Sequence, residues 1–197
     1  MTTGRVVPAI IAVTALGGVV LQLVVSPVWN VFAYFTIQSN LLLGVTNLML
    51  ALGPDRPRSV PFKVLRLNGV LCIAVTGIVY HIALAGLDEL SGGAAVANFL
   101  LHTAAPVLGV LGWVFFGPRG ATDLRIAAWS IVYPLLWLAF TLVRGAADGF
   151  YPYPFVNVTE HGYGQVLLNC LLVAVLFLAL AAGATALDRR LRKTVER

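Results

Sequence analysis

Six long apolar stretches run through the chain, and they limit its possible folds more than any other feature. They cover residues 6–26, 31–52, 65–87, 94–117, 125–145 and 163–187. An α-helix rises about 1.5 Å per residue, so about 20 apolar residues cross the roughly 30 Å hydrocarbon core of a bilayer. The pattern predicts an all-α, polytopic membrane protein, with one transmembrane domain over residues 1–197 folded as a six-helix bundle.

The composition agrees with this fold class. Hydrophobic residues make up 59% of the chain and charged residues 11%, whereas a soluble domain carries about 25% charged residues. The formal net charge is +5, but the basic residues flank the apolar stretches and form no basic, aromatic-rich segment that could follow a phosphate backbone. We therefore expect membrane lipids as partners and no nucleic acid. The sequence leaves the oligomeric state open.

The basic residues also predict how the bundle is oriented. With six spans, every Lys and Arg except Arg144 falls on the side that holds both termini. Loops rich in Lys and Arg stay in the cytoplasm, so we expect both termini to be cytoplasmic in a multi-pass protein of the cell (plasma) membrane, with residues 188–197 as a basic tail. The residues behind this prediction are Arg5, Arg56, Arg58, Lys63, Arg66, Arg119, Arg125, Arg189, Arg190, Arg192, Lys193 and Arg197.

Common cofactor and metal motifs are missing from the sequence. It contains no glycine-rich dinucleotide loop, no Walker loop, no H-E-x-x-H and no G-x-S-x-G. Cys72 and Cys170 lie inside apolar stretches at different predicted depths, and neither belongs to a C-x-x-C pair. We expect no disulfide, no metal and no cofactor.

Polar residues from several spans converge at one depth. Polar and ionisable groups are costly in hydrocarbon, so each needs a partner or a function. In the predicted topology, the outer half of the bundle holds Thr36, Asn40, His81, Asn98, His102, Arg144, Gln165 and Asn169. Asparagines in such helices mostly bridge neighbouring helices, and Arg144 at a helix end either snorkels to the interface or binds an anionic group. Pro106 should kink the fourth span just after His102.

Three short motifs carry a family resemblance. They are Phe35-Thr36 near the start of the second span, Leu101-His102-Thr103 with Pro106 on the fourth, and Tyr153-Pro154-Phe155 before the sixth. In this order they resemble the androgen-induced family of intramembrane threonine hydrolases, multi-helix enzymes that cleave fatty acid esters of hydroxy fatty acids. Over essentially its whole length the chain also resembles an uncharacterised bacterial family of six-transmembrane-helix integral membrane proteins.

The resemblance implies a hydrolase of lipid (fatty acyl) esters. Thr36 takes the place of the nucleophile and His102 that of the general base, because a threonine hydroxyl attacks only when a base removes its proton. From spacing and charge, Asn40 is a candidate oxyanion donor and Arg144 a candidate partner for a substrate carboxylate. Residues 37–40 differ from what the hydrolase motif leads us to expect, and the sequence identifies no residue that orients His102.

Two other functions fit the same residues. A non-catalytic bundle that binds lipids or small molecules, such as a transport or sensory accessory, would have the same polar pocket without needing Thr36 as a nucleophile. A b-type haem protein could use His81 and His102 as axial ligands on neighbouring helices.

Overall fold

The computed structural model of the chain describes residues 3–26, 29–53, 59–87 and 89–195, and within these ranges all regular structure is helical. Six helical segments are long and apolar enough to cross a membrane. They are Gly4–Val25, Phe35–Leu52, Val60–Leu84, Gly92–Phe116, Leu124–Asp148 and Val158–Arg192. The predicted all-α fold with six spans is therefore confirmed, although the boundaries differ from the predicted ones by several residues.

Several spans contain more than one helical element. The α-helices are α1 (Thr3–Val25), α2 (Phe35–Leu52), α3 (Val60–Val79), α4 (Gly92–Phe99), α5 (Ala105–Phe116), α6 (Leu124–Ser130), α7 (Val132–Asp148) and α8 (Val158–Val195). The short elements are η1 (Val31–Ala33), η2 (Tyr80–Leu84), η3 (Leu100–Ala104) and η4 (Pro154–Val156). The break between α6 and α7 precedes Pro134, which has no N–H for the carbonyl of Ser130.

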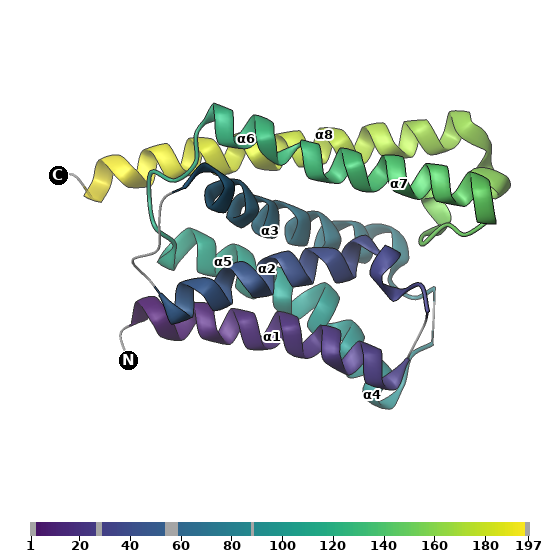
Figure 1. Cartoon of the computed structure of the whole chain (residues 1–197), viewed down its shortest axis with the longest axis horizontal. Helices are drawn as coiled ribbons and strands as arrows, with labels where there is room; N and C mark the ends of the chain where they lie inside the picture. Colours follow the sequence, from purple (N-terminus) through teal and green to yellow (C-terminus); the bar gives the residue numbers. More distant parts are fainter. Residues whose placement is uncertain (1–2, 27–28, 54–58, 88, 196–197) are drawn as a thin grey trace.

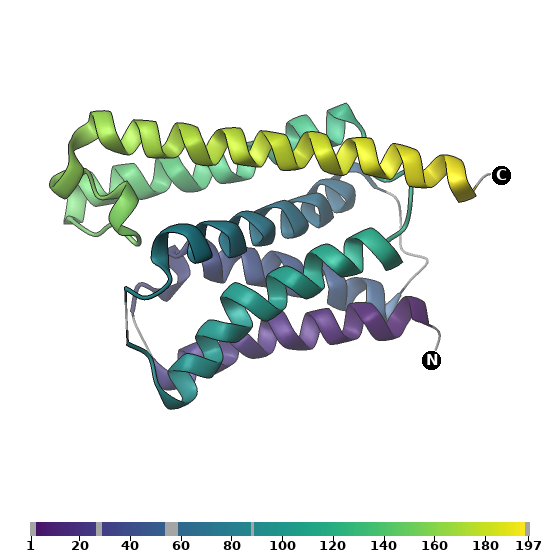
Figure 2. The same ribbon diagram turned by 180° about the vertical axis from the view of Figure 1, so that it is seen from behind.

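Helix α3 occupies the centre of the bundle. It contacts α2 and α5 on one side and α6 and α8 on the other, and Figures 1 and 2 show α6, α7 and α8 as a layer across it. Ile73 of α3 joins a core with α1, α2 and α5, whereas Leu71 of α3 joins a core with α6 and α8. A helix that is apolar on all sides is expected at such a buried position.

The outer faces of α7 and α8 are apolar and exposed. Leu135, Leu136 and Val143 on α7, and Leu171 and Leu172 on α8, each expose more than half of their surface. An apolar surface of this kind is rare on a soluble monomer and is the surface that lipid chains require. These faces agree with a protein embedded in a membrane.

Both described ends of the chain lie at the same end of the bundle (Figure 1), as an even number of spans requires. Helix α8 continues to Val195, so the predicted tail over residues 188–197 begins as part of a helix. Asp188 is buried there, and its carboxylate accepts hydrogen bonds from the amides of Gly120 (3.1 Å) and Thr122 (2.8 Å). Arg56, Arg58 and Arg197 of the orientation argument lie outside the described residues.

Candidate functional site

Two widened helical turns interrupt the third and fourth spans. In η2 the amide of Ala85 donates to the carbonyl of Tyr80, and in η3 the amide of Ala105 donates to the carbonyl of Leu100, five residues back instead of four. Such π-turns are rare and are often found at functional sites. Here they carry both histidines that the sequence places within the spans.

Pro106 explains the turn in the fourth span. It has no N–H for the carbonyl of His102, and its ring would clash with that carbonyl in a regular helix. The disturbance predicted at His102 therefore takes the form of a π-turn just before the proline. Gly77 of α3 packs on this point, because a Cβ atom there would lie only 2.8 Å from Cβ of Pro106. The close approach brings Tyr80 onto His102, with ring centroids 4.1 Å apart and the rings tilted by 21°.

Thr36 and His102 are hydrogen-bonded to each other. Oγ1 of Thr36 lies 3.2 Å from Nε2 of His102, and Nδ1 of His102 lies 3.2 Å from the carbonyl oxygen of Asn98. A carbonyl oxygen only accepts, so in the neutral imidazole Nδ1 carries the proton and Nε2 is free to accept one from the Thr36 hydroxyl. The group that orients His102 is thus a backbone carbonyl one turn earlier, which side-chain motifs do not reveal.

Tyr153 completes the surroundings of Thr36. Its hydroxyl oxygen accepts a hydrogen bond from the Thr36 amide at 3.0 Å and lies 3.1 Å from Oγ1. Thr36 is the second residue of α2, so its amide has no partner within the helix, and Tyr153 supplies the missing acceptor. Burial raises the pKa of Tyr153 to about 12, which keeps the phenol protonated at neutral pH. When Thr36 donates to His102, Tyr153 donates to Thr36.

Tyr153 is buried although it lies in the loop before the last span. Its side chain is only 8% exposed. It packs with Val156 and Val166 in a separate hydrophobic cluster next to the short helix η4. The prolines on both sides of Tyr153, which fix φ, are the sequence signal for a rigid turn at this point.

Asn40 links α2 to the π-turn in the fourth span. Its Nδ2 donates to the carbonyls of Thr36 (2.9 Å) and Leu101 (3.2 Å). The Leu101 carbonyl needs this donor, because the amide of Ala105 binds Leu100 and Pro106 has no N–H. Both N–H groups of Asn40 are therefore used, and neither points to an oxyanion beside Thr36.

His81 and Asn98 both contact Tyr80, whose ring stacks on His102. Nδ2 of Asn98 donates to the Tyr80 hydroxyl at 2.5 Å, and Nε2 of the exposed His81 lies 3.1 Å from Oγ1 of Thr103. The Tyr80 ring contacts both imidazoles, with centroids 5.1 Å from His81 and 4.1 Å from His102. A haem held by both histidines would have to displace that ring.

Arg144 is separate from this cluster. It pairs with Asp148 (2.9 Å), donates to Oδ1 of Asn30 (2.6 Å) and lies over the ring of Phe150. It lines an open cavity of about 360 Å³ together with residues such as Trp29 and Phe140. Thr36 does not line this cavity.

Gln165 and Asn169 support the turn that carries Tyr153. Gln165 donates to Asn169 (2.9 Å), and Asn169 donates to the carbonyl of Phe155 (2.9 Å). The structure therefore brings together Thr36, Asn40, Asn98 and His102 of the predicted residues. Gln165 and Asn169 contribute only through the loop.

An apolar cavity of about 360 Å³ opens beside Thr36. Thr36, Thr76 and Tyr153 supply hydroxyl groups to its wall, and most of the remainder is apolar, from residues such as Val79, Leu138 and Phe177. It lies between α2, α3, α7 and α8. His102 is not part of this wall and contacts Thr36 from outside the cavity. The arrangement joins a hydroxyl, a base and an apolar chamber.

Comparisons of the chain with protein-family models, with curated proteins and with solved structures find no match. The family resemblance seen in the three sequence motifs stays a prediction, and the function is argued below from the site itself.

Proposed function

We propose that the protein is an intramembrane hydrolase of fatty acyl esters, with Thr36 as the nucleophile and His102 as the general base. The observation that carries this proposal is the 3.2 Å contact between Oγ1 of Thr36 and Nε2 of His102, next to the apolar cavity. A nucleophile within hydrogen-bond reach of a base that a third group orients is the arrangement that covalent catalysis requires.

The reaction takes two steps. Oγ1 of Thr36 attacks the ester carbonyl carbon while its proton passes to Nε2 of His102. The bond to the alcohol oxygen breaks, that oxygen takes the proton from Nε2, and the acyl group remains on Thr36 as an ester. Water then gives a proton to Nε2 and attacks the acyl carbon. The bond to Oγ1 breaks, Oγ1 takes the proton back, and the carboxylic acid leaves.

Tyr153 is the proposed donor to the oxyanion. A negative charge develops on the former carbonyl oxygen as the tetrahedral intermediate forms, and a fixed hydrogen-bond donor stabilises it. The Tyr153 hydroxyl lies 3.1 Å from Oγ1 of Thr36 and lines the same cavity. Its O–H donates to Oγ1 in the resting site and turns to the oxyanion once Oγ1 has bonded to the acyl carbon. The Asn40 side chain, whose N–H groups both bind backbone carbonyls, takes a structural role.

The membrane setting limits the substrate. The apolar cavity fits an acyl chain, and lipid-facing surfaces on α7 and α8 offer a route from the bilayer. We place the protein in the plasma membrane with both termini in the cytoplasm, so that Thr36 lies in the outer half of the bundle. The substrates are then amphiphilic esters that enter from the lipid.

One observation favours a second function. Thr36 is only 6% exposed, and its hydroxyl already has two partners. A bundle that binds an amphiphile in the cavity without cleaving it would need Thr36 only as part of the wall. This non-catalytic binding protein, such as a transport accessory, is the alternative that the experiment must separate from the hydrolase.

Labelling with a long-chain fluorophosphonate separates the two functions. The hydrolase should form a covalent adduct on Thr36, identified by peptide mass spectrometry, and Thr36→Ala should remove it. Thr76→Ala is the matched control, because Thr76 lines the same cavity but its hydroxyl binds Ser39. Gel filtration checks that each variant is folded. A native protein that takes no label but binds a non-hydrolysable acyl ester would refute the hydrolase and support the binding function.

A further inference from the structure

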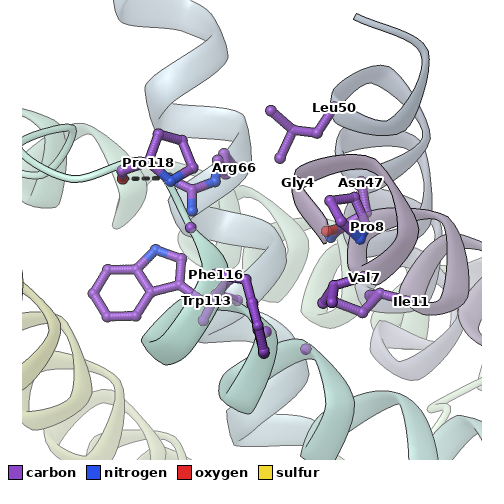
Figure 3. Close-up of a pocket in the computed structure, with 14 residues that line it drawn as sticks. Gly4, Val7, Pro8, Ile11, Asn47, Leu50, Arg66, Trp113, Phe116 and Pro118 are labelled. Atoms are coloured by element: carbon purple, nitrogen blue, oxygen red, sulfur yellow. Dashed lines mark hydrogen bonds between the residues drawn. The ribbon is translucent and has the colours of Figure 1, made fainter. Parts of the chain in front are cut away.

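A third cavity lies at the opposite end of the bundle from Thr36. Its volume is about 240 Å³, and it is enclosed by the first turns of α1, the last turns of α2, the start of α3 and the end of α5. Figure 3 shows Arg66 reaching toward Pro118, with Trp113 and Phe116 below it in this view and Val7, Pro8 and Ile11 of α1 opposite. This is the end where both termini lie (Figure 1).

The charged group in this cavity is a buried guanidinium. Arg66 is only 7% exposed. Within the described part of the chain its one hydrogen bond is a long one, 3.4 Å from Nη1 to the carbonyl of Pro118. A guanidinium has five N–H donors, so most of its hydrogen-bonding capacity is left for the cavity.

Among the residues that the structure describes, no charged group neutralises Arg66 by direct contact. Asp188 attracts it electrostatically, but the two carboxylate oxygens of Asp188 bind the amides of Gly120 and Thr122. Arg119, a second cation, binds the carbonyls of Trp113 and Val114 at the end of α5. Burying a charge without a paired counter-charge is costly, so an anion in the cavity would offset a cost that the described residues leave in place.

The backbone makes room for the guanidinium. Gly117 ends α5, and a Cβ atom there would lie only 2.1 Å from Nη2 of Arg66. The Arg66 side chain therefore packs directly on Cα of Gly117, and this contact positions the guanidinium at the cavity wall. A second polar group, Asn47, lines the cavity. Its Nδ2 donates to the carbonyl of Leu43 in its own helix, and its Oδ1 accepts no hydrogen bond from the residues that the structure describes.

We propose that this cavity binds a phosphate group through Arg66, and that its physiological source is the headgroup of an anionic phospholipid that also bears a hydroxyl. The guanidinium fork matches the oxygens of a phosphate, and Oδ1 of Asn47 accepts from the headgroup hydroxyl. Apolar residues such as Val7, Ile11 and Phe116 suit the part of the lipid that follows the phosphate. The site is independent of Thr36 and of any hydrolase activity.

Native mass spectrometry of the detergent-purified protein tests the site. With added phosphatidylglycerol, the native protein should retain one lipid, and Arg66→Gln should lower the bound fraction at least about tenfold, as expected for losing a charge-assisted hydrogen bond. Lys63→Gln removes the same charge one turn earlier on α3 and should bind as the native protein does. Equal retention by native and Arg66→Gln, or equal retention of phosphatidylcholine, would overturn the proposal.

Further measurements identify where the bound phosphate comes from and control for misfolding of the variants. Phosphatidic acid has the phosphate without the hydroxyl, so Asn47→Leu should remove the preference for phosphatidylglycerol over phosphatidic acid. Inorganic phosphate alone could raise the melting temperature of the native protein but not of Arg66→Gln. The cavity would then bind phosphate through Arg66, and the ligand would be free phosphate from solution. Arg66→Lys keeps the charge but loses the fork, and it should fold and bind the lipid more weakly. If Arg66→Lys binds the lipid with the affinity of the native protein, the proposed role of the guanidinium is wrong.

Discussion

Tyr153 holds Thr36 by two contacts, one to its amide and one to its hydroxyl. The phenolic oxygen lies 3.0 Å from the Thr36 nitrogen and 3.1 Å from Oγ1. The two residues are 117 positions apart in the chain. One hydroxyl therefore caps the start of α2, sets the direction of the candidate nucleophile and ties the last loop to the second span.

Tyr153→Phe should lower ester turnover about a hundredfold, which is the usual effect of losing one oxyanion donor. It should also lower the free energy of unfolding by about 1–3 kcal/mol, because the Thr36 amide loses its acceptor. The ring contacts with Tyr34 and Phe155 stay. Turnover and thermal unfolding in detergent measure the two effects. Tyr151→Phe, in the same loop, is the control and should change neither; native turnover in Tyr153→Phe would exclude the oxyanion role.

The pair Thr36 and His102 should behave as one catalytic unit. Thr36→Ser keeps the attacking oxygen and loses only the methyl group that restricts χ1, so part of the turnover should remain. Thr36→Ala and His102→Ala should each abolish nearly all turnover, and the double variant should be hardly worse than either, because losses within such a unit are not additive. Hydrolysis of a long-chain fluorogenic ester in micelles measures this. Full activity in folded Thr36→Ala contradicts the hydrolase.

Asn40→Leu should destabilise the bundle by about 1–3 kcal/mol, because the buried Leu101 carbonyl loses its donor. Asn47→Leu is the matched control on the same helix. Its side chain binds the Leu43 carbonyl within α2, which keeps its helical partner, so little change is expected. Chemical unfolding in detergent compares the two. Equal stabilities would mean that the link from α2 to the π-turn contributes nothing.

The six-span fold could be predicted because length and hydropathy decide it. Each span must bury its backbone hydrogen bonds within a helix of a set length, and this requirement acts locally. The boundaries were less predictable, as Asp188 shows. The sequence assigned it to a tail, but its carboxylate binds the amides of Gly120 and Thr122 on a distant segment.

The candidate site could be predicted only in part. The predicted depth put Thr36 and His102 in the same layer, and in the structure Oγ1 of Thr36 lies 3.2 Å from Nε2 of His102. The contribution of Tyr153 depends on how a loop folds back, and the orientation of His102 depends on a backbone carbonyl. Neither leaves a periodic signal in the sequence. Arg144 was a candidate partner for a substrate carboxylate; in the structure it binds Asp148 and Asn30 and lines another cavity.

The orientation of the bundle can be tested with single cysteines. Cys72 and Cys170 are free thiols, so both are first replaced by alanine. Single cysteines then go to exposed positions at the two ends of the bundle. Ser59 and Arg189 lie at the end with the termini, and Ala147 lies at the other end.

The distribution of basic residues predicts that the termini face the cytoplasm. In intact cells an impermeant maleimide should therefore label Ala147→Cys and leave Ser59→Cys and Arg189→Cys unlabelled. After permeabilisation all three should react, because all three positions are exposed; this step shows that protection came from the membrane and not from burial. The opposite labelling pattern would invert the bundle. It would place Thr36 in the cytoplasmic half and the Arg66 cavity in the outer one, so that each proposed site would draw its lipid from the other leaflet.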